Sequence, residues 1–192
     1  NHIRDAKTAI VVEGQMDFLM MWQDGIKNVV ASSGTALTRD QLEILRRLAD
    51  TLILSFDSDA AGLAAAERSI DLAHALDFNV KVLTVEGAKD PADVVFSAPG
   101  KMAGFVQASV PAMEFYFRRY AGGGDLAARK KNLRVVLGKI REVQSAVERD
   151  AYLRDLSLRT SIADTVLREE IDSLAPAAKL NSGGSAVATE PA

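Results

Sequence analysis

Short, unbroken apolar runs alternate with helical patterns through the first half of the chain. The apolar runs span residues 8–12, 28–31, 51–56 and 79–85, and the helical patterns lie near 16–24, 38–49 and 60–77. Runs of this length that are rich in Ile, Val and Leu are typical of parallel strands buried on both faces. Strands that alternate with helices imply right-handed crossovers, so the pattern predicts an α/β fold with a parallel sheet of about four strands flanked by helices.

Polar residues mark where two of the helices should begin. Thr38 is followed three residues later by Gln41, which is the spacing of a capping box, in which each side chain bonds the backbone N–H of the other residue. Asp90 precedes Pro91, and proline is tolerated at the first helical position because that N–H has no partner within the helix. These signals predict helices that begin directly after Thr38 and Asp90.

The pattern changes after Pro99, where helical periodicity continues without a further convincing strand. Helical segments are predicted at about 101–108, 111–120, 125–143, 145–159 and 161–174. The third has a basic outer face and apolar core positions at Leu126, Leu133, Val136, Leu137 and Ile140. We therefore expect an α/β domain at 1–100, an all-helical subdomain at 101–174 and, from its Ala, Ser, Gly and Pro content, a disordered linker or tail at 175–192.

Acidic residues follow two of the apolar runs. Glu13, with Gly14 behind it, follows the first run, and Asp57 and Asp59 follow the third. The ligand crevice of an open parallel sheet lies outside the carboxyl ends of its strands, so we expect these carboxylates to converge there. They would repel one another unless a cation lay between them, and hard oxygen ligands without nearby His or Cys favour Mg²⁺ or Mn²⁺.

Several polar residues that we expect at this edge of the sheet have two possible explanations, one structural and one functional. Asp17 can complement the dipole of the helix that it begins, and Asp59 can cap the helix at 60–77. The Lys-Asp-Pro-Ala-Asp segment at 89–93 can cap a helix or join the site. The loop at 32–35, Ser-Ser-Gly-Thr, can admit a nucleotide phosphate or serve only as a tight connection.

Composition narrows the possible functions. The 192 residues are 48% hydrophobic, contain no cysteine and carry a net charge of −3. Disulfides and thiolate metal sites are therefore excluded, and nucleic-acid binding would need a local basic patch. No apolar run approaches the roughly 20 residues of a membrane span. The chain lacks an initiator Met, so we expect it to be a fragment of a longer protein, and we expect no membrane partner.

Four segments together resemble a known family. They are Val-Val-Glu-Gly-Gln-Met-Asp at 11–17, Ala-Ser-Ser-Gly-Thr-Ala-Leu-Thr at 31–38, Phe-Asp-Ser-Asp-Ala-Ala-Gly at 56–62 and Lys-Asp-Pro at 89–91. This combination resembles the Toprim domain, in the version found in bacterial DnaG-type primases. The helical stretch that includes 147–153 is similar to the helical subdomain of the primase catalytic core.

The resemblance implies a nucleotidyltransferase, a DNA-directed RNA polymerase that makes short primers on single-stranded DNA from ribonucleoside triphosphates during replication. It implies Mg²⁺ or Mn²⁺ held by Glu13, Asp57 and Asp59, with Glu13, Asp17 and Asp90 as the catalytic acids. The chain departs from the common pattern at Ala92, where many primases carry a second acid. Asp93, one position later, is an alternative for that acid.

The resemblance also implies parts that lie outside this chain. These are a zinc-binding domain, a basic subdomain and a region that contacts the replicative helicase, so the fragment would be an incomplete primosome enzyme of the bacterial cytoplasm and nucleoid. Two other functions share the acidic pattern: phosphodiester cleavage by a Toprim nuclease or topoisomerase, and a non-catalytic recombination scaffold. A topoisomerase needs a nucleophilic tyrosine, and Tyr116, Tyr120 and Tyr152 all lie in helical segments.

Overall fold

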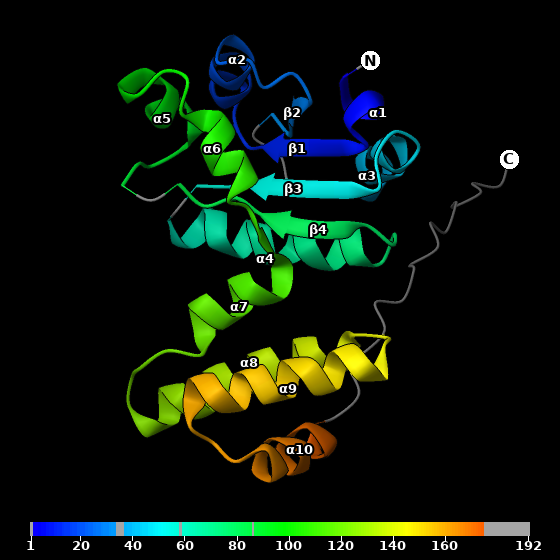
Figure 1. Ribbon diagram of the computed structural model, residues 1–192, viewed down its shortest axis with the longest axis vertical. Helices are drawn as coiled ribbons and strands as arrows, with labels where there is room; N and C mark the ends of the chain where they lie inside the picture. Colours follow the sequence, from blue (N-terminus) through cyan, green and yellow to red (C-terminus); the bar gives the residue numbers. More distant parts are fainter. Residues whose placement is uncertain (1, 34–36, 58, 86, 175–192) are drawn as a thin grey trace, which may run out of the picture. The chain divides into compact units, whose positions relative to one another are not determined.

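The computed structural model describes residues 2–33, 37–57, 59–85 and 87–174, and the chain forms two compact units that divide between Tyr116 and Phe117 (Figure 1). The expected linker or tail at 175–192 lies outside the described residues, as do Gly34 and Thr35 of the loop at 32–35.

The first unit contains the alternating strands and helices that the sequence predicts. Its elements are α1 (His2–Ala6), β1 (Thr8–Val12), α2 (Gln15–Gln23), β2 (Val29–Ala31), α3 (Arg39–Arg46), β3 (Thr51–Ser55), α4 (Ala60–His74), β4 (Asn79–Val82), α5 (Pro91–Ser97), α6 (Met102–Gln107) and β5 (Val110–Pro111), after which α7 (Ala112–Tyr120) begins. All four predicted strands are present, and β4 ends earlier than the apolar run suggests.

The sheet has five strands in the order β2-β1-β3-β4-β5. The first four are parallel, and β5 is antiparallel to β4, with Lys81 opposite Pro111. The expectation of no strand after Pro99 is therefore wrong, because a two-residue strand is too short to give a periodic signal. Since β5 pairs with β4, the first compact unit extends past the expected boundary at residue 100.

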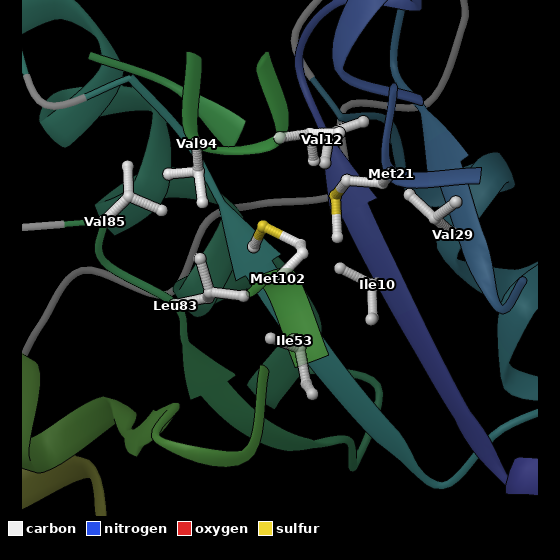
Figure 2. Packing of buried hydrophobic residues seen from close by; sticks show 10 residues of the cluster. Ile10, Val12, Met21, Val29, Ile53, Leu83, Val85, Val94 and Met102 are labelled. Atoms are coloured by element: carbon white, nitrogen blue, oxygen red, sulfur yellow. The ribbon is translucent and has the colours of Figure 1, made fainter. Parts of the chain in front are cut away.

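The strands are apolar on both faces because helices cover both. Ile10 and Val12 of β1 and Ile53 of β3 point into one cluster with Met21 of α2, Val94 of α5 and other residues (Figure 2). The intervening residues of the same strands, such as Leu52 and Leu54, are also fully buried, on the face where α4 contacts β3 and β4. Burial from both sides explains why β1 reads as an unbroken apolar run.

The helix starts agree with the cap signals in the sequence. The Thr38 hydroxyl accepts a hydrogen bond from Gln41 N at 3.3 Å, and the Gln41 side chain accepts one from Thr38 N at 2.9 Å. Asp90 caps α5, where Pro91 occupies the first helical turn. These bonds satisfy N–H groups that a helix leaves without an internal partner.

The second unit is helical, as expected, and contains α8 (Leu126–Glu142), α9 (Ala146–Thr160) and α10 (Asp164–Ser173) after the end of α7. Its buried apolar side chains are Phe117, Val136, Leu137, Ile140, Leu153, Leu156, Leu167 and Ile171. Leu126 was expected in this core but is 81% exposed, because it is the first residue of α8, directly after the Asp125 cap. In the part of the chain that the structure describes, no helix is long and apolar enough to cross a membrane.

The buried third strand gives a stability prediction. Leu54 is 0% exposed, so Leu54→Ala should leave a cavity and lower the free energy of unfolding by about 2 to 5 kcal/mol. Ile44→Ala, at a 61% exposed position of α3, should change it by less than about 0.5 kcal/mol. Urea denaturation of both variants measures the difference, and equal losses would contradict the burial of β3.

Candidate active site

The strand order makes the pair β1 and β3 the topological switch point of the sheet. From β1 the chain passes to β2 on one side and then to β3 on the other, so the direction of winding reverses at this pair. Ligands of open α/β sheets bind at such a switch point, outside the carboxyl ends of the strands. Val12 lies opposite Ser55 in the sheet, so Glu13 and Asp57 leave their strands at nearly the same level.

Glu13 and Asp57 are in contact across this point. Asp57 N donates a hydrogen bond to Glu13 Oε1 at 3.3 Å, and both side chains are half-buried. Burial raises the pKa of Glu13 above its ordinary value, the bond from Asp57 N lowers it, and repulsion from the neighbouring acids raises it further. The predicted convergence of these two residues is therefore observed.

Asp57 also lies beside a cation. Its Oδ2 is 3.9 Å from Lys89 Nζ, from the loop that leads into α5. Burial raises the pKa of Asp57, Lys89 acts in the opposite direction, and repulsion from Asp90 and other acids adds to the rise. The sequence interpretation included Lys89 in a motif but gave it no role. Its position directly before Asp90, which caps α5, could have indicated that its side chain lies at the same edge of the sheet.

Asp59 caps α4, as one explanation of the motif predicts. Its Oδ1 accepts a hydrogen bond from Gly62 N at 2.8 Å, and the residue is exposed. A Cβ on Gly62 would lie only 2.3 Å from Asp57 O, so the first turn of α4 packs directly on the backbone that carries Asp57. The sequence interpretation did not identify this role of Gly62. Ser58, between the two acids, lies outside the described residues.

Asp17 is more deeply buried than the other acids, at 7% exposed. Its Oδ2 accepts a hydrogen bond from Gly14 N and its Oδ1 accepts one from Ala92 N, both at 3.2 Å. Burial raises the pKa of Asp17, and the nearby Asp90 and Asp57 raise it further, while the two backbone bonds lower it. Asp17 therefore ties the turn after β1 to the start of α5, and its catalytic role stays a prediction.

The acids of the α5 loop are engaged in its cap. Asp90 Oδ1 accepts a hydrogen bond from Asp93 N at 2.9 Å, and Asp93 is exposed in the first turn of α5. Ala92, where the chain departs from the common acidic pattern, uses its backbone N–H to hold Asp17. A catalytic role for Asp90, and a substitute role for Asp93, stay predictions.

The serine loop borders the same edge of the sheet. Ser32, directly after β2, is buried, and its hydroxyl donates to Glu13 O at 3.5 Å. It therefore supports the backbone at the carboxyl end of β1. The expectation that a nucleotide phosphate could approach the loop at 32–35 falls in part on residues 34 and 35, which lie outside the described residues.

The donor chemistry at this edge fits a divalent cation. Glu13, Asp57 and Asp59 offer only hard carboxylate oxygens, which suit Mg²⁺ or Mn²⁺. Among the described residues, no group of three or more His, Cys, Asp or Glu side chains already surrounds an ion position. Asp59 Oδ1 accepts the hydrogen bond from Gly62 N that caps α4. To bind an ion together with Glu13 and Asp57, Asp59 would have to share this bond or give it up.

Comparisons with known proteins agree with this geometry. Residues 10–95 match a family described as Toprim-like, and residues 113–165 match a family described as the DnaB-helicase binding domain of primase. The DNA primase of Clostridium acetobutylicum is 34% identical over 177 residues, which are 90% of this chain and 29% of that protein. The chain thus spans less than a third of the length of this relative.

Solved structures show the same fold. The RNA polymerase domain of Mycobacterium tuberculosis primase DnaG is 31% identical, with a TM-score of 0.66, over 81% of this chain and 52% of that one. The same domain in complex with a double-stranded DNA oligomer that has a 6-nucleotide overhang is 29% identical, with a TM-score of 0.67. The match covers 85% of this chain and 54% of that one. The Toprim prediction and the fold class are confirmed. The helicase-binding match lies inside this chain, whereas the sequence interpretation placed helicase contact outside it.

The close approach at Gly62 gives a testable consequence. Gly62→Ala should displace the Asp57 backbone, because the added Cβ meets backbone atoms that cannot rotate away, and should lower the free energy of unfolding by about 1 to 3 kcal/mol. Gly104→Ala in α6, where a Cβ meets nothing within 4 Å, should be neutral or stabilise by up to about 1 kcal/mol. Thermal or urea unfolding compares the two variants. A Gly62→Ala variant with the stability of the parent would disprove the close packing of α4 on the Asp57 backbone.

The raised pKa of Glu13 also predicts how the free energy of unfolding depends on pH when no divalent ion is bound. The pKa of Glu13 is raised above 4.5 in the folded protein, so the folded state binds more protons than the unfolded state between the two values. Stability should fall as pH rises through that window, and the cost should persist above it. Glu13→Gln should therefore be more stable than the parent at pH of about 7, with the difference shrinking towards about pH 4.

Urea titrations in EDTA at several pH values measure this effect. Glu43→Gln, an exposed carboxylate that pairs with Arg39 on α3, controls for the loss of one charge and should not reproduce the gain at neutral pH. A Glu13→Gln variant that is less stable than the parent at every pH would contradict the crowding.

Proposed function

We propose that this chain, which belongs to the Toprim-containing DnaG-type DNA primases, forms part of the catalytic centre that joins ribonucleotides into short primers on single-stranded DNA. The observation that carries the proposal is the meeting of Glu13 and Asp57 at the switch point, through the Asp57 N to Glu13 Oε1 hydrogen bond. Relatives named DNA primase support it, although each is much longer than this chain.

The chain's own residues account for how such a centre is built. Glu13, Asp57 and Asp59 would hold divalent ions, which supply charge neutralisation for the in-line displacement at the α-phosphate. Glu13 lies where it could act as an ion ligand or as a general base that accepts the 3′-hydroxyl proton, and a carboxylate suits either role. Asp17 holds the turn after β1 against α5 and so fixes the position of Glu13.

The partners follow from the same proposal. Single-stranded DNA is the template and ribonucleoside triphosphates are the substrates, and the location is the bacterial cytoplasm at the nucleoid. We infer that contact with the replicative helicase involves the 113–165 segment, which matches a helicase-binding family. A zinc-binding domain, as named in the solved Aquifex aeolicus primase, would be supplied by another part of the protein.

Phosphodiester cleavage, the alternative use of the same acids, has less support. A topoisomerase reaction needs an accessible tyrosine, and Tyr116 is 1% exposed within α7. Tyr120 and Tyr152 belong to the helical unit, where the Tyr152 ring packs edge-on against Phe117 at 6.2 Å between centroids. No observation favours a recombination scaffold over an enzyme, because the three principal acids, Glu13, Asp57 and Asp59, are retained.

Substitution of the acids in the full-length protein tests the proposal. Asp57→Asn and Glu13→Gln should each lower primer synthesis by about 100-fold or more, because each removes an ion ligand, and should weaken Mn²⁺ binding. Asp59→Asn should act similarly while keeping most of the cap of α4. Primer synthesis on single-stranded template, Mn²⁺ titration and melting temperature are measured for each variant.

Asp40→Asn, an exposed acid in the first turn of α3, is the matched control and should leave priming unchanged. Nicked template in place of primers would support the cleavage alternative. Normal priming and Mn²⁺ binding by Asp57→Asn would show that this edge of the sheet is not the catalytic centre.

A further inference from the structure

Lys89 is a basic side chain that reaches the acidic edge without being buried in it. Its Nζ lies 3.9 Å from Asp57 Oδ2, and its side chain is 66% exposed, against 24% for Asp57. An ion pair with this exposure contributes little to folding, because water solvates the ammonium almost as well. The contact can therefore form and break without cost to the fold.

The backbone directly after Lys89 is anchored at the start of α5. The next residue, Asp90, caps α5 through its bond from Asp93 N, and Ala92 N is bound by the buried Asp17. A lysine on such an anchor has a four-carbon arm that can swing while its Cα stays in place. Its ammonium can therefore leave Asp57 and still remain at the same edge of the sheet.

Two different partners compete for Asp57. In the ion-free protein the ammonium offsets part of the repulsion that Asp57 receives from the surrounding acids. An ammonium and a divalent cation on one carboxylate repel each other, so binding of the ion at Asp57 disfavours the Lys89 contact. A triphosphate bound to that ion would offer the displaced ammonium a new anionic partner within reach.

We propose that Lys89 is an exchangeable counter-ion of this site: it partly neutralises Asp57 in the ion-free protein, and it contacts the phosphates of the incoming nucleoside triphosphate once Asp57 holds a divalent cation. This inference rests on the proposed function. It assigns Lys89 opposite effects on the two ligands, since the ammonium competes with the cation and attracts the nucleotide.

Two binding measurements on the full-length protein test the exchange. Lys89→Gln should bind Mn²⁺ about threefold to tenfold more tightly without nucleotide, as followed by the electron paramagnetic resonance signal of free Mn²⁺. At saturating Mn²⁺ the same variant should bind α,β-methylene ATP about fivefold or more weakly, as measured by calorimetry. Lys89→Arg, which keeps the charge, should stay close to the parent in both.

Lys101 is exposed at the beginning of α6 and serves as the control position. Lys101→Gln removes the same charge and should change neither the Mn²⁺ affinity nor the nucleotide affinity by more than about twofold. Unchanged Mn²⁺ and nucleotide affinities in Lys89→Gln would overturn the proposal, as would a change in only one of them. Failure of the proposed function is distinguishable, because then Asp57→Asn would bind Mn²⁺ as the parent does, whatever the behaviour of Lys89.

Discussion

Crowding of carboxylates at the carboxyl ends of β1 and β3 is the constraint on which the first unit depends. Burial raises the pKa of Glu13, Asp17 and Asp57, and mutual repulsion adds to the effect. Groups of this kind reduce stability at neutral pH, so the surrounding structure must hold them against their tendency to separate. The fold is therefore organised to keep together side chains that repel one another.

Contacts between distant segments provide this restraint. Asp57 N binds Glu13, 44 residues earlier, and Ala92 N binds Asp17, 75 residues earlier. Gly62 lets α4 begin directly against the Asp57 backbone, where any side chain would collide. Each contact uses a backbone group, whose position is set by a buried strand or a capped helix. The acids are thus fixed by the sheet and the helix starts rather than by their own side-chain packing.

Much of this arrangement could be predicted from the sequence because strands buried on both faces leave a strong signal. The apolar runs located β1 to β4, and the acids that follow β1 and β3 had to meet at one edge of a parallel sheet. The short β5 escaped prediction because its pairing with β4 depends on a partner about 30 residues away in the chain and not on its own pattern.

The side-chain roles were less predictable than the fold. Leu126 fits the apolar period of α8 but lies at the helix start, where no partner covers it. Asp17 fits an acidic catalytic set, yet its two oxygens bind backbone N–H groups that only the folded chain brings near. A periodic pattern specifies which face a residue occupies, whereas these roles depend on three-dimensional contacts between separate elements.

Helix N-termini offset part of the cost of bringing the acids together. The turn at Gly14 begins α2, and Asp59 begins α4, so the partial positive charges of both helix starts lie beside the acids. These partial charges and the bound N–H groups lower the cost of the cluster. They do not cancel it, since the pKa of Glu13 and that of Asp57 remain raised. Burial accounts for the largest part of this cost and repulsion between the acids for the rest, and a divalent cation bound by the carboxylates would relieve that repulsion.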